Sequence, residues 1–503
     1  MKGKAQSNSE SRRNALPLRR DENFPEWYQH VVRAANLAEF GAVRGCMTIK
    51  PNGYAIWEVM QSTLDAMIKA SGHRNAYFPL FIPKSYLERE AEHVDGFAKE
   101  CAVVTHGKLV RSDGGKLIAA APLEEQLIVR PTSETIIGEA FSRWIQSHRD
   151  LPLLINQWAN VVRMEMRPRL FLRTVEFLWQ EGHTAHSSAE EAREETLRML
   201  ELYRVFAEEH MCVPVTCGLK TTRERFPGAL DTYAIEAMMQ DGKALQMGTS
   251  HFLGQNFAKA CSIKYADSDG AEKFAWTTSW GVSTRLIGGL IMAHGDDDGL
   301  VLPPPVAPVQ IAILPMVRGD GDGAPIKWAE TLKIRLEETR LKSGASLRVA
   351  VDDRQLRGGE KFWQKVREGI AIIVEVGARE LDDGTVTFTL RGSRKVTIGI
   401  DKFVASAANI LDDYGEELFN RQLRLRLEKT VRVSGFDEMR DFFAAGNGFV
   451  EAHFCGDRAL EERICAELSI GTRCVPLGTI DDVGPCIADP SRVGPLTIWA
   501  KAY

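Results

Sequence analysis

Apolar residues repeat at three- and four-residue steps between positions 56 and 68, which is the spacing of one face of a helix. The repeat ends at Gly72, and glycine commonly ends a helix because it adopts the left-handed conformation without strain. The next segment, NAYFPLFIP, predicts an extended strand, and its Pro79 and Pro83 favour a sheet edge because proline donates no backbone hydrogen bond. The pattern alone favours an internal core helix followed by a loop.

Beyond residue 302 the pattern changes to short buried strands that alternate with helices. Pro303, Pro304, Pro305 and Pro308 exclude a helix there, so we place a domain boundary near Leu302. Short apolar runs predict strands and periodic stretches predict helices, which together indicate an α/β module. The strands are expected at 311–314, 347–351 and 371–376, and the helices at 326–341 and 360–368.

The last hundred or so residues predict a further folded unit. A long helical stretch is expected from about Asp401 to Lys429, followed by a smaller mixed module that ends on the apolar tail GPLTIWAKAY. The chain is therefore expected to divide into a disordered tail at 1–22 and three domains at 23–302, 303–402 and 403–503.

Charge and cysteine content narrow the class of protein. The 503 residues carry 63 basic and 68 acidic side chains, a net charge of −5, which is not the footprint of a protein that binds nucleic acid over its whole surface. Any such contact would use local patches. The nine cysteines include no CxxC pair, which favours a reducing compartment. No apolar run approaches the ~20 residues that cross a bilayer, and the N-terminus lacks a secretory signal, so we expect no membrane contact and a cytoplasmic protein.

A charged motif in the first domain suggests phosphate binding. Arg163, Glu165 and Arg167 alternate along NVVRMEMRPRLFLRTVEFLWQEGH and would share one face of a strand. The other face would be apolar, with Val162, Met164 and Met166. A second strand is expected at 170–177, and a hairpin would bring its Arg173 close to Arg163. Two arginines at one site suit a triphosphate.

These residues resemble motifs 2 and 3 of a class II aminoacyl-tRNA synthetase, and longer segments narrow the resemblance to prolyl-tRNA synthetase. The segments are RPTSE at 130–134, FLRTVEFLWQEGHTAH at 171–186, GKALQMGTSHFLGQNFA at 242–258 and TTSWGVSTRLIGGLIMAHGDDDGLVLPP at 277–304. The likeness extends from about Phe24 to the C-terminus. Long, ordered and mutually consistent segments carry more weight than one short motif.

The resemblance implies an α/β (α+β) fold class. The catalytic domain at 23–302 would have the antiparallel sheet of class II synthetases, 303–402 would be the α/β anticodon-binding domain, and 403–503 a small α+β domain with degenerate zinc ligands. The helix and strand near 56–83 would form motif 1, which implies a homodimer. Only about a hundred residues separate Phe177 from Trp276, so the chain is similar to the archaeal and eukaryotic type without the editing insertion.

A proline substrate needs an anion for its ammonium group and a cation near its carboxylate, and Glu134 and Arg163 suit these roles. Thr132 could share the face of Glu134 in an extended segment, or both could form a turn and a helix start before IIGEAF. By the resemblance, four residues would contact proline: Thr132, Glu134, Arg163 and His251. Three others would form the excluding wall: Trp179, Glu181 and His183.

The resemblance also implies an ATP site. Arg163 would hold the α-phosphate, and Arg285, at the start of a helix, would reach the γ-phosphate, where the helix dipole favours anions. The other expected contacts are Glu165 with a bridging metal or the adenine amino group, Arg173 and Thr174 beside the nucleotide, Phe177 on the adenine ring, and Gln246 and Thr249 on the ribose. The expected catalytic residues are Arg163, Glu165 and Arg285. A surface ion pair is the commoner role of any single arginine.

Two further sites are expected outside the catalytic domain. DDRQLRGGEKFWQKVREG resembles the segment that meets the anticodon, so Asp353, Arg354 and Lys361 are candidate anticodon contacts, with a solvated helix face as the alternative. In the C-terminal domain four cysteines of the family bind zinc. Only Cys455 and Cys486 occupy those positions here, beside Leu460 and Asp489, so no structural zinc is expected and no residue is assigned to a metal.

The expected reaction is ATP-dependent ligation of L-proline to its tRNA through a prolyl-adenylate, with Mg²⁺ accompanying ATP. Neither step needs a protein nucleophile, so the lack of a Ser/His/Asp set is no objection. The alternatives are a catalytically silent tRNA-binding sensor or regulator, and a duplicate or biosynthetic paralogue on the same scaffold. The expected partners are proline, its tRNA and a second copy of the chain.

Overall fold

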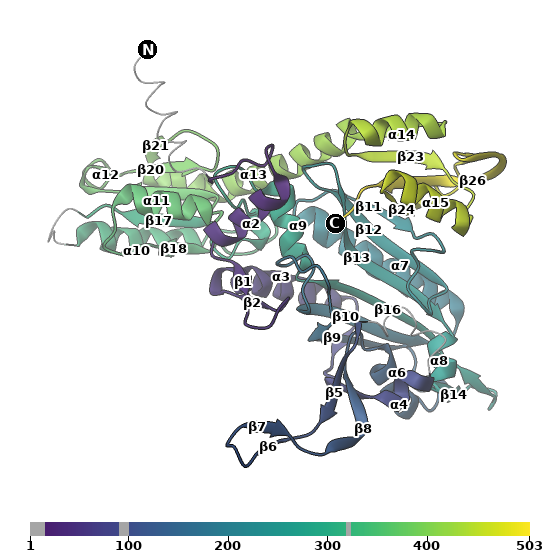
Figure 1. Cartoon of the computed structure of the whole chain (residues 1–503). Helices are drawn as coiled ribbons and strands as arrows, with labels where there is room; N and C mark the ends of the chain where they lie inside the picture. Colours follow the sequence, from purple (N-terminus) through teal and green to yellow (C-terminus); the bar gives the residue numbers. More distant parts are fainter. Residues whose placement is uncertain (1–15, 90–99, 318–322) are drawn as a thin grey trace.

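The computed structural model describes residues 16–89, 100–317 and 323–503. A twisted sheet occupies the centre of the molecule, an α/β module and a small C-terminal unit lie at opposite ends of one side, and a narrow hairpin projects from the other side (Figure 1). No helix in the described part of the chain is long and apolar enough to cross a membrane.

The central sheet has 12 strands, in the order β22-β23-β26-β24-β11-β12-β13-β16-β10-β9-β3, with β25 paired to β26. All neighbours are antiparallel except β3 with β9 and β22 with β23. The strands in the catalytic part are β3 (Arg74–Asn75), β9 (Leu153–Val162), β10 (Glu176–His186), β11 (Val215–Leu219), β12 (Asp231–Met238), β13 (Ala244–Gly254) and β16 (Trp276–Ser283). The C-terminal strands are β22 (Thr430–Arg432), β23 (Phe449–His453), β24 (Gly471–Pro476), β25 (Val483–Cys486) and β26 (Asp489–Ala500).

Helices of the catalytic part share one apolar core with this sheet. They are α2 (Phe24–Ala34), α3 (Pro51–Ala70), α7 (Ala189–Val205) and α9 (Arg285–His294). Gly72, at φ +97°, follows the end of α3, which confirms the predicted helix and its glycine stop. Gly182 of β10 permits a close approach, because a Cβ there would lie 2.0 Å from the Trp280 ring.

A second, smaller sheet carries the projecting hairpin. Its order is β4-β8-β5, so the proline-bearing strand β4 lies at an edge, as the sequence predicted. The strands are β4 (Phe81–Pro83), β5 (Ala102–His106) and β8 (Pro122–Val129), with α6 (Glu134–Trp144) packed beside them. The hairpin consists of β6 (Leu109–Arg111) and β7 (Leu117–Ala119).

The α/β module contains the strands and helices predicted beyond residue 302. Its sheet has the order β18-β17-β19-β20-β21 and a separate apolar core. The strands are β17 (Ile311–Pro315), β18 (Val349–Val351), β19 (Ile372–Val376), β20 (Thr385–Leu390) and β21 (Val396–Gly399). The helices are α10 (Ala324–Glu337), α11 (Gly358–Arg367) and α12 (Ala378–Asp383).

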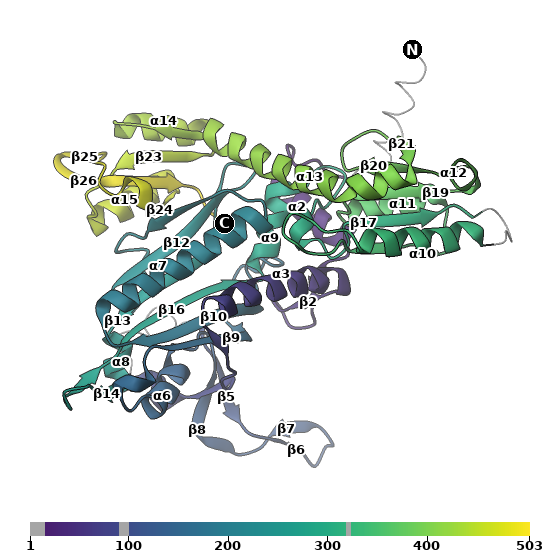
Figure 2. The same ribbon diagram turned by 180° about the vertical axis from the view of Figure 1, so that it is seen from behind.

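One long helix, α13 (Ile400–Glu428), runs from the module to the C-terminal unit, as Figure 2 shows from behind. The C-terminal unit adds α14 (Phe436–Ala445) and α15 (Arg458–Leu468) against its strands. Its strand β24 pairs with β11 of the catalytic part at Gly218 and Leu219, so one sheet joins the two.

The charged strand expected at 163–167 is absent, which corrects the sequence interpretation. β9 ends at Val162, and the chain then turns irregularly until β10 begins at Glu176. The expected apolar back is also wrong, because Met164 is 50% and Met166 83% exposed. The hairpin itself is present, since Val162 lies opposite Glu176.

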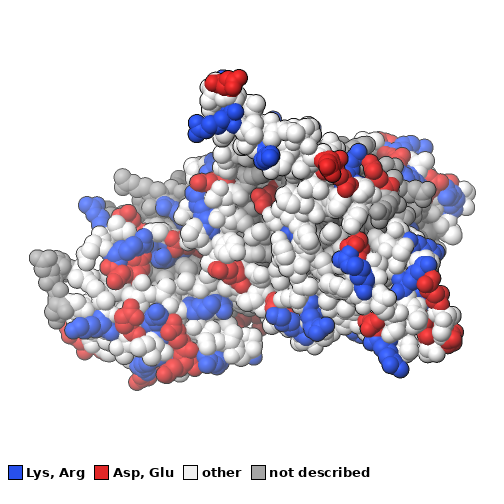
Figure 3. All heavy atoms as spheres, turned by 90° about the horizontal axis from the view of Figure 1, so that it is seen from below, with Lys and Arg blue, Asp and Glu red and all other residues white. Residues whose placement is uncertain are grey.

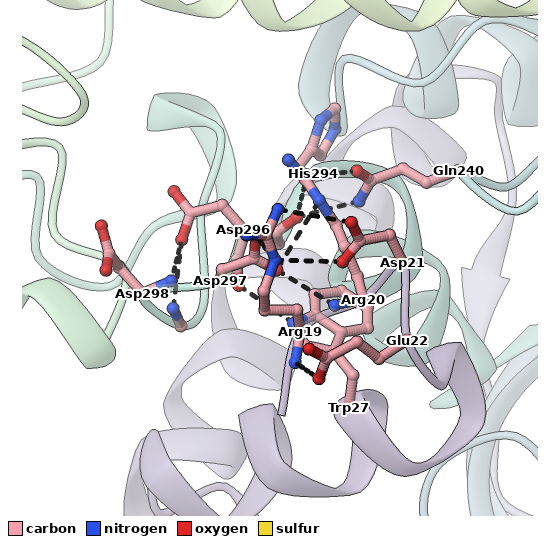
Figure 4. Close-up of polar contacts among 12 residues, drawn as sticks. Arg19, Arg20, Asp21, Glu22, Trp27, Gln240, His294, Asp296, Asp297 and Asp298 are labelled. Carbon is pink, nitrogen blue, oxygen red and sulfur yellow. Dashed lines mark hydrogen bonds and ion pairs between the residues drawn. The ribbon is translucent and has the colours of Figure 1, made fainter. Parts of the chain in front are cut away.

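Residues 16–22 pack against the loop after α9, although they were expected to belong to a disordered tail. Leu16 is buried, and its backbone N–H donates to the Asp297 carbonyl at 2.8 Å. Arg20 donates to Gln240 at 2.6 Å and to the Gly295 carbonyl at 3.2 Å (Figure 4). The same loop binds the α/β module, because Arg391 contacts both carboxylate oxygens of Asp296, at 2.6 and 3.1 Å. The rest of the expected tail, 1–15, lies outside the described residues.

Candidate active site

A cavity of about 320 Å³ lies on the central sheet, beside the start of α9. It brings together most of the sequence-predicted site residues. These are Thr132, Glu134, Arg163, Phe177, Trp179, Glu181, His183, Gln246, Thr249, His251 and Arg285.

Strand β10 supplies alternate side chains to this cavity. Trp179, Glu181 and His183 line it, because side chains two residues apart on a strand share one face. Gln180, between them, lies on the opposite face, where its side chain is 2.5 Å from the Tyr203 hydroxyl of α7. One face of the strand therefore binds the helix, and the other forms the site.

Strand register places the two histidines of the site in one row. His183 lies opposite Ser279 of β16, and Ser279 lies opposite His251 of β13. Gly281, in the next row, has no side chain and leaves space between Glu181 and Thr249. The residues at the centre of the cavity floor, Ser279 and Gly281, are therefore small, and the residues beside them on β10 and β13 are polar.

Two sequence-predicted carboxylates, Glu134 and Glu181, line the cavity. Glu134 is the first residue of α6, as the alternative interpretation expected, and its carboxylate accepts a hydrogen bond from the Thr132 hydroxyl. Glu181 is 2% exposed and accepts hydrogen bonds from Ser133 at 2.5 Å and from Gln157 at 2.7 Å. Buried carboxylates need such partners, and these contacts fix both groups in place.

The two histidines have opposite protonation tendencies. Burial disfavours the charged form of His183, but its hydrogen bond to Glu181 and the charges of Glu134 and Glu181 outweigh burial and raise its pKa. Burial, with the charge of His183, lowers the pKa of His251 to about 3. His251 is therefore neutral, and its Nδ1 lies 3.0 Å from the Thr232 hydroxyl. The same residue type therefore has a raised pKa at one position and a lowered pKa at the other.

Two sequence-predicted arginines, Arg163 and Arg285, line the cavity. Arg163 follows the end of β9, its Nε donates to the Pro131 carbonyl at 2.9 Å, and its guanidinium lies 5.7 Å from the rings of Phe177 and Trp179. Arg285 begins α9, and burial together with the charges of Arg173 and Arg163 lowers its pKa to about 10. Mutually repelling cations at a helix N-terminus favour an anionic ligand.

Three predicted ATP contacts do not line the cavity. Glu165 accepts a hydrogen bond from the Arg167 backbone at 3.0 Å, and the buried Thr174 hydroxyl donates to the Glu176 carbonyl at 2.8 Å. Arg173 is exposed, although its charge reaches Arg285. These three lie on the irregular connection between β9 and β10, where strand alternation does not apply.

Comparison with known proteins identifies the family. Residues 118–294 match the tRNA synthetase class II core domain (G, H, P, S and T), residues 310–409 an anticodon binding domain, and residues 436–503 the prolyl-tRNA synthetase C-terminal family. The chain is 53% identical to a proline–tRNA ligase of Rhodopirellula baltica, over 98% of this chain and 99% of that one. It is 54% identical to a proline–tRNA ligase of Paramagnetospirillum magneticum, over 98% of this chain and 100% of that one.

The chain belongs to the prolyl-tRNA synthetases. Among solved structures it is similar to prolyl-tRNA synthetase from Cryptosporidium parvum in complex with L-proline and AMP, with 34% identity, a TM-score of 0.87 and 97% coverage of both chains. The same enzyme in complex with halofuginone and AMPPNP gives a TM-score of 0.88. The expected family and fold class are confirmed.

In this synthetase the candidate anticodon residues differ in accessibility. Asp353 and Arg354 are exposed, and Arg354 is paired with Asp352 at 2.7 Å. Lys361 is only 4% exposed, and its ammonium donates to the Asp352 carbonyl at 2.9 Å. The anticodon contact of Lys361 stays a prediction, and in this structure its charged group is held inside the module.

The C-terminal unit of the synthetase retains two thiols at the expected zinc positions. Burial raises the pKa of the Cys455 thiol, and its contact with the Cys486 thiol acts in the same direction. Leu460 packs against the apolar core, and Asp489 accepts a hydrogen bond from the Ser491 hydroxyl at 2.6 Å. Among the described residues no group of three His, Cys, Asp or Glu side chains could hold a metal. The absence of zinc stays a prediction.

Sequence reasoning missed one wall of the site. The loop between β11 and β12 supplies Glu224, Arg225, Phe226 and Pro227 to the cavity, and Thr232 adds a hydroxyl. The Pro-Gly pair in RERFPGAL indicates a turn but gives no sign of its place in the fold.

Proposed function

We propose that this synthetase activates L-proline with ATP in the cavity above β10, β13 and β16, and then transfers it to tRNA for proline. The observation that carries the proposal is that one cavity is lined by the carboxylates of Glu134 and Glu181 and by the guanidinium groups of Arg163 and Arg285. A zwitterionic amino acid and a polyanion fit side by side in such a site.

The charges suggest where each part of the substrates binds. The proline ammonium would lie near Glu134 and Thr132, with neutral His251 beside it and the Trp179 ring against the apolar side of the pyrrolidine. Arg163 interacts electrostatically with Glu134 and Glu181 and also with Arg285, so we expect it to contact both the proline carboxylate and the α-phosphate. Arg285 would receive the outer phosphates.

The reaction then proceeds in two displacements. A carboxylate oxygen of proline attacks the α-phosphorus, and pyrophosphate leaves with the bonding electrons. The terminal adenosine hydroxyl of tRNA next attacks the acyl carbon, and AMP leaves. The protein contributes position and fixed charge, which is sufficient because neither step requires a covalent enzyme intermediate.

The proposal includes Mg²⁺ as a companion of ATP. The described residues contain no group of three potential ligands, so phosphate oxygens and water would supply most of the coordination, which Mg²⁺ accepts readily. Glu165 stays our candidate for a protein contact to that ion or to the adenine amino group. Asp353 and Arg354 stay candidates for the anticodon.

We further propose a cytoplasmic homodimer. All nine cysteines are free thiols, which suits a reducing compartment. The hairpin of β6 and β7 and the segment before β4 expose large apolar side chains, with Tyr77 71%, Leu109 63% and Leu117 64% exposed. Figure 3 shows a broad uncharged area in the middle of the face seen from below. Exposed apolar area of this kind marks interaction surfaces, and light scattering of the purified protein would give its mass.

The test is pyrophosphate exchange with a panel of amino acids, followed by tRNA charging. We expect proline to be the preferred substrate and Arg163→Ala to lower exchange by ~10²- to 10³-fold, the usual cost of one preorganised donor. Arg149→Ala, which changes an exposed arginine away from the cavity, is the matched control. Near-normal exchange by a folded Arg163→Ala protein would refute the assignment. The comparisons give no support to a silent regulator, and exchange activity would exclude it.

A further inference from the structure

The loop between β11 and β12 reaches the cavity without strand pairing of its own. Its ends are tied to the sheet, because Lys220 N–H donates to the Thr232 carbonyl at 2.8 Å and Leu230 N–H to the Phe252 carbonyl at 2.9 Å. Between these points the backbone hydrogen bonds of the loop close local turns, such as the one from Glu224 N–H to the Thr221 carbonyl at 3.1 Å. Side-chain contacts must therefore fix where the loop lies.

Helix α15 of the C-terminal unit provides those contacts at the start of the loop. The Glu461 carboxylate, 1% exposed, accepts a hydrogen bond from the Thr221 hydroxyl at 3.0 Å and another from the Thr472 hydroxyl at 2.5 Å. The Arg223 guanidinium lies 3.6 Å from the same carboxylate and donates to the Cys465 sulfur at 3.1 Å. Two residues of α15 thus bind two residues of the loop.

Further along the loop, Phe226 contacts residues of the cavity. Phe226 N–H donates to the Thr232 hydroxyl at 3.0 Å, and that hydroxyl lies 3.0 Å from His251 Nδ1. The Phe226 ring also packs on the His251 ring, with centroids 4.5 Å apart. A continuous series of contacts therefore connects Glu461 with His251.

We infer that Glu461 is a positioning residue for the proline pocket, which acts from the C-terminal unit through the loop at 221–230. The inference rests on the proposed placement of proline beside His251. A buried carboxylate is costly unless its partners are present, and here the partners that supply hydrogen bonds and charge include both loop residues, Thr221 and Arg223. Loss of the contact would release the start of the loop while the sheet stays paired.

The same geometry predicts which kinetic constant changes. The loop contacts His251 through the Phe226 ring, whereas Arg285 lies at the start of α9 and donates to the Leu172 carbonyl. A displaced loop would therefore raise the KM for proline about tenfold, since small misplacements of binding groups cost factors of ten or more. The KM for ATP would stay within about twofold of wild type.

The sharpest test compares Thr221→Val with Thr221→Ser in the full-length protein. Valine has the shape of threonine without the hydroxyl that reaches Glu461, whereas serine keeps the hydroxyl. We expect valine to raise the KM for proline about tenfold in pyrophosphate exchange and serine to stay within about twofold of wild type. Glu461→Gln, which keeps an oxygen for Thr221 but loses the charge facing Arg223, should lie between them.

Glu462→Ala is the matched control, because Glu462 is the next residue on α15 and its carboxylate pairs with Arg458 on the exposed side. It should leave both KM values unchanged. Equal KM values for proline in Thr221→Val and wild type, or equal rises in the KM for proline and for ATP, would overturn the inference. If Glu461→Gln does not fold, the two Thr221 variants still decide the question.

A His251→Ala variant separates this inference from the proposed function. An unchanged KM for proline in that variant would contradict the placement of proline itself. A raised KM in His251→Ala together with a normal KM in Thr221→Val would leave the placement intact and reject only the role of Glu461.

Discussion

Replacing Arg285 by glutamine should stabilise the free enzyme and abolish its activity. The pKa of Arg285 falls from its usual value to about 10, first because of burial and then because of the charges of Arg173 and Arg163. Below both of these values the side chain is charged in the folded and the unfolded state. The folded state is therefore destabilised by the full amount at neutral pH, and this destabilisation disappears only as the pH rises above about 10 towards the usual pKa of arginine.

The size of the cost follows from the lowered pKa. At 1.36 kcal/mol for each pKa unit, a fall to about 10 corresponds to roughly 3 kcal/mol. Arg285 is only half-buried, so solvent screens part of this, and glutamine also loses the hydrogen bond from Nε to the Leu172 carbonyl. We expect a net gain of about 1 kcal/mol, or a thermal midpoint roughly 2 °C higher.

The assay is thermal unfolding with and without ATP, beside pyrophosphate exchange. Without ATP, Arg285→Gln should unfold at a higher temperature than wild type. With ATP at about 100 times its Kd, wild type should gain about 2.7 kcal/mol and overtake the variant, whose exchange rate should be ~10²- to 10³-fold lower. Arg149→Gln should change neither quantity. An ATP-free variant less stable than wild type, or one with near-normal exchange, would refute the reasoning.

Three further outcomes are expected. Arg391→Met, which removes the ion pair with Asp296 between the α/β module and the loop after α9, should lower tRNA charging about tenfold and leave pyrophosphate exchange unchanged; equal losses in both assays would contradict this. His183→Gln should destabilise the protein most below pH 6.5, and the difference in unfolding free energy should shrink as the pH rises through the raised pKa of His183. Urea titrations from about pH 6 to 9 would measure this difference. A difference that does not change with pH would contradict a role for the pairing with Glu181. Elemental analysis of chelator-washed protein should find no stoichiometric zinc, and a resistant zinc bound at Cys455 would overturn that expectation.

The sequence predicted elements well where one face of each element meets a core. The apolar repeat before Gly72 gave α3, and the short apolar runs beyond residue 302 gave β17 and β19 within about two residues. In these segments burial alone decides the pattern, so periodicity is a sufficient guide.

Periodicity predicted the wrong structure for the segment that borders the site and does not pack in the core. The alternation of Arg163 and Glu165 predicted a strand, but the segment is an irregular connection between β9 and β10. The loop that carries Phe226 has no periodic signal, and its contact with Glu461 joins residues far apart in the chain. The burial of Lys361 has no sequence signal either, because only the fold shows that its ammonium donates to the Asp352 carbonyl.

The pairing of β24 with β11 has a consequence for synthesis of the chain on the ribosome. Gly218 leaves room for Cys474, since a Cβ at that glycine would lie 2.5 Å from the Cys474 sulfur, so this edge of β11 is shaped for a partner made more than 250 residues later. Until that partner emerges, the nascent catalytic part exposes an open strand edge, the kind of surface that recruits other chains into aggregates. Late closure of the sheet makes β24 the cover of an edge that is synthesised much earlier, and release of a chain that stops before Gly471 would leave that edge open.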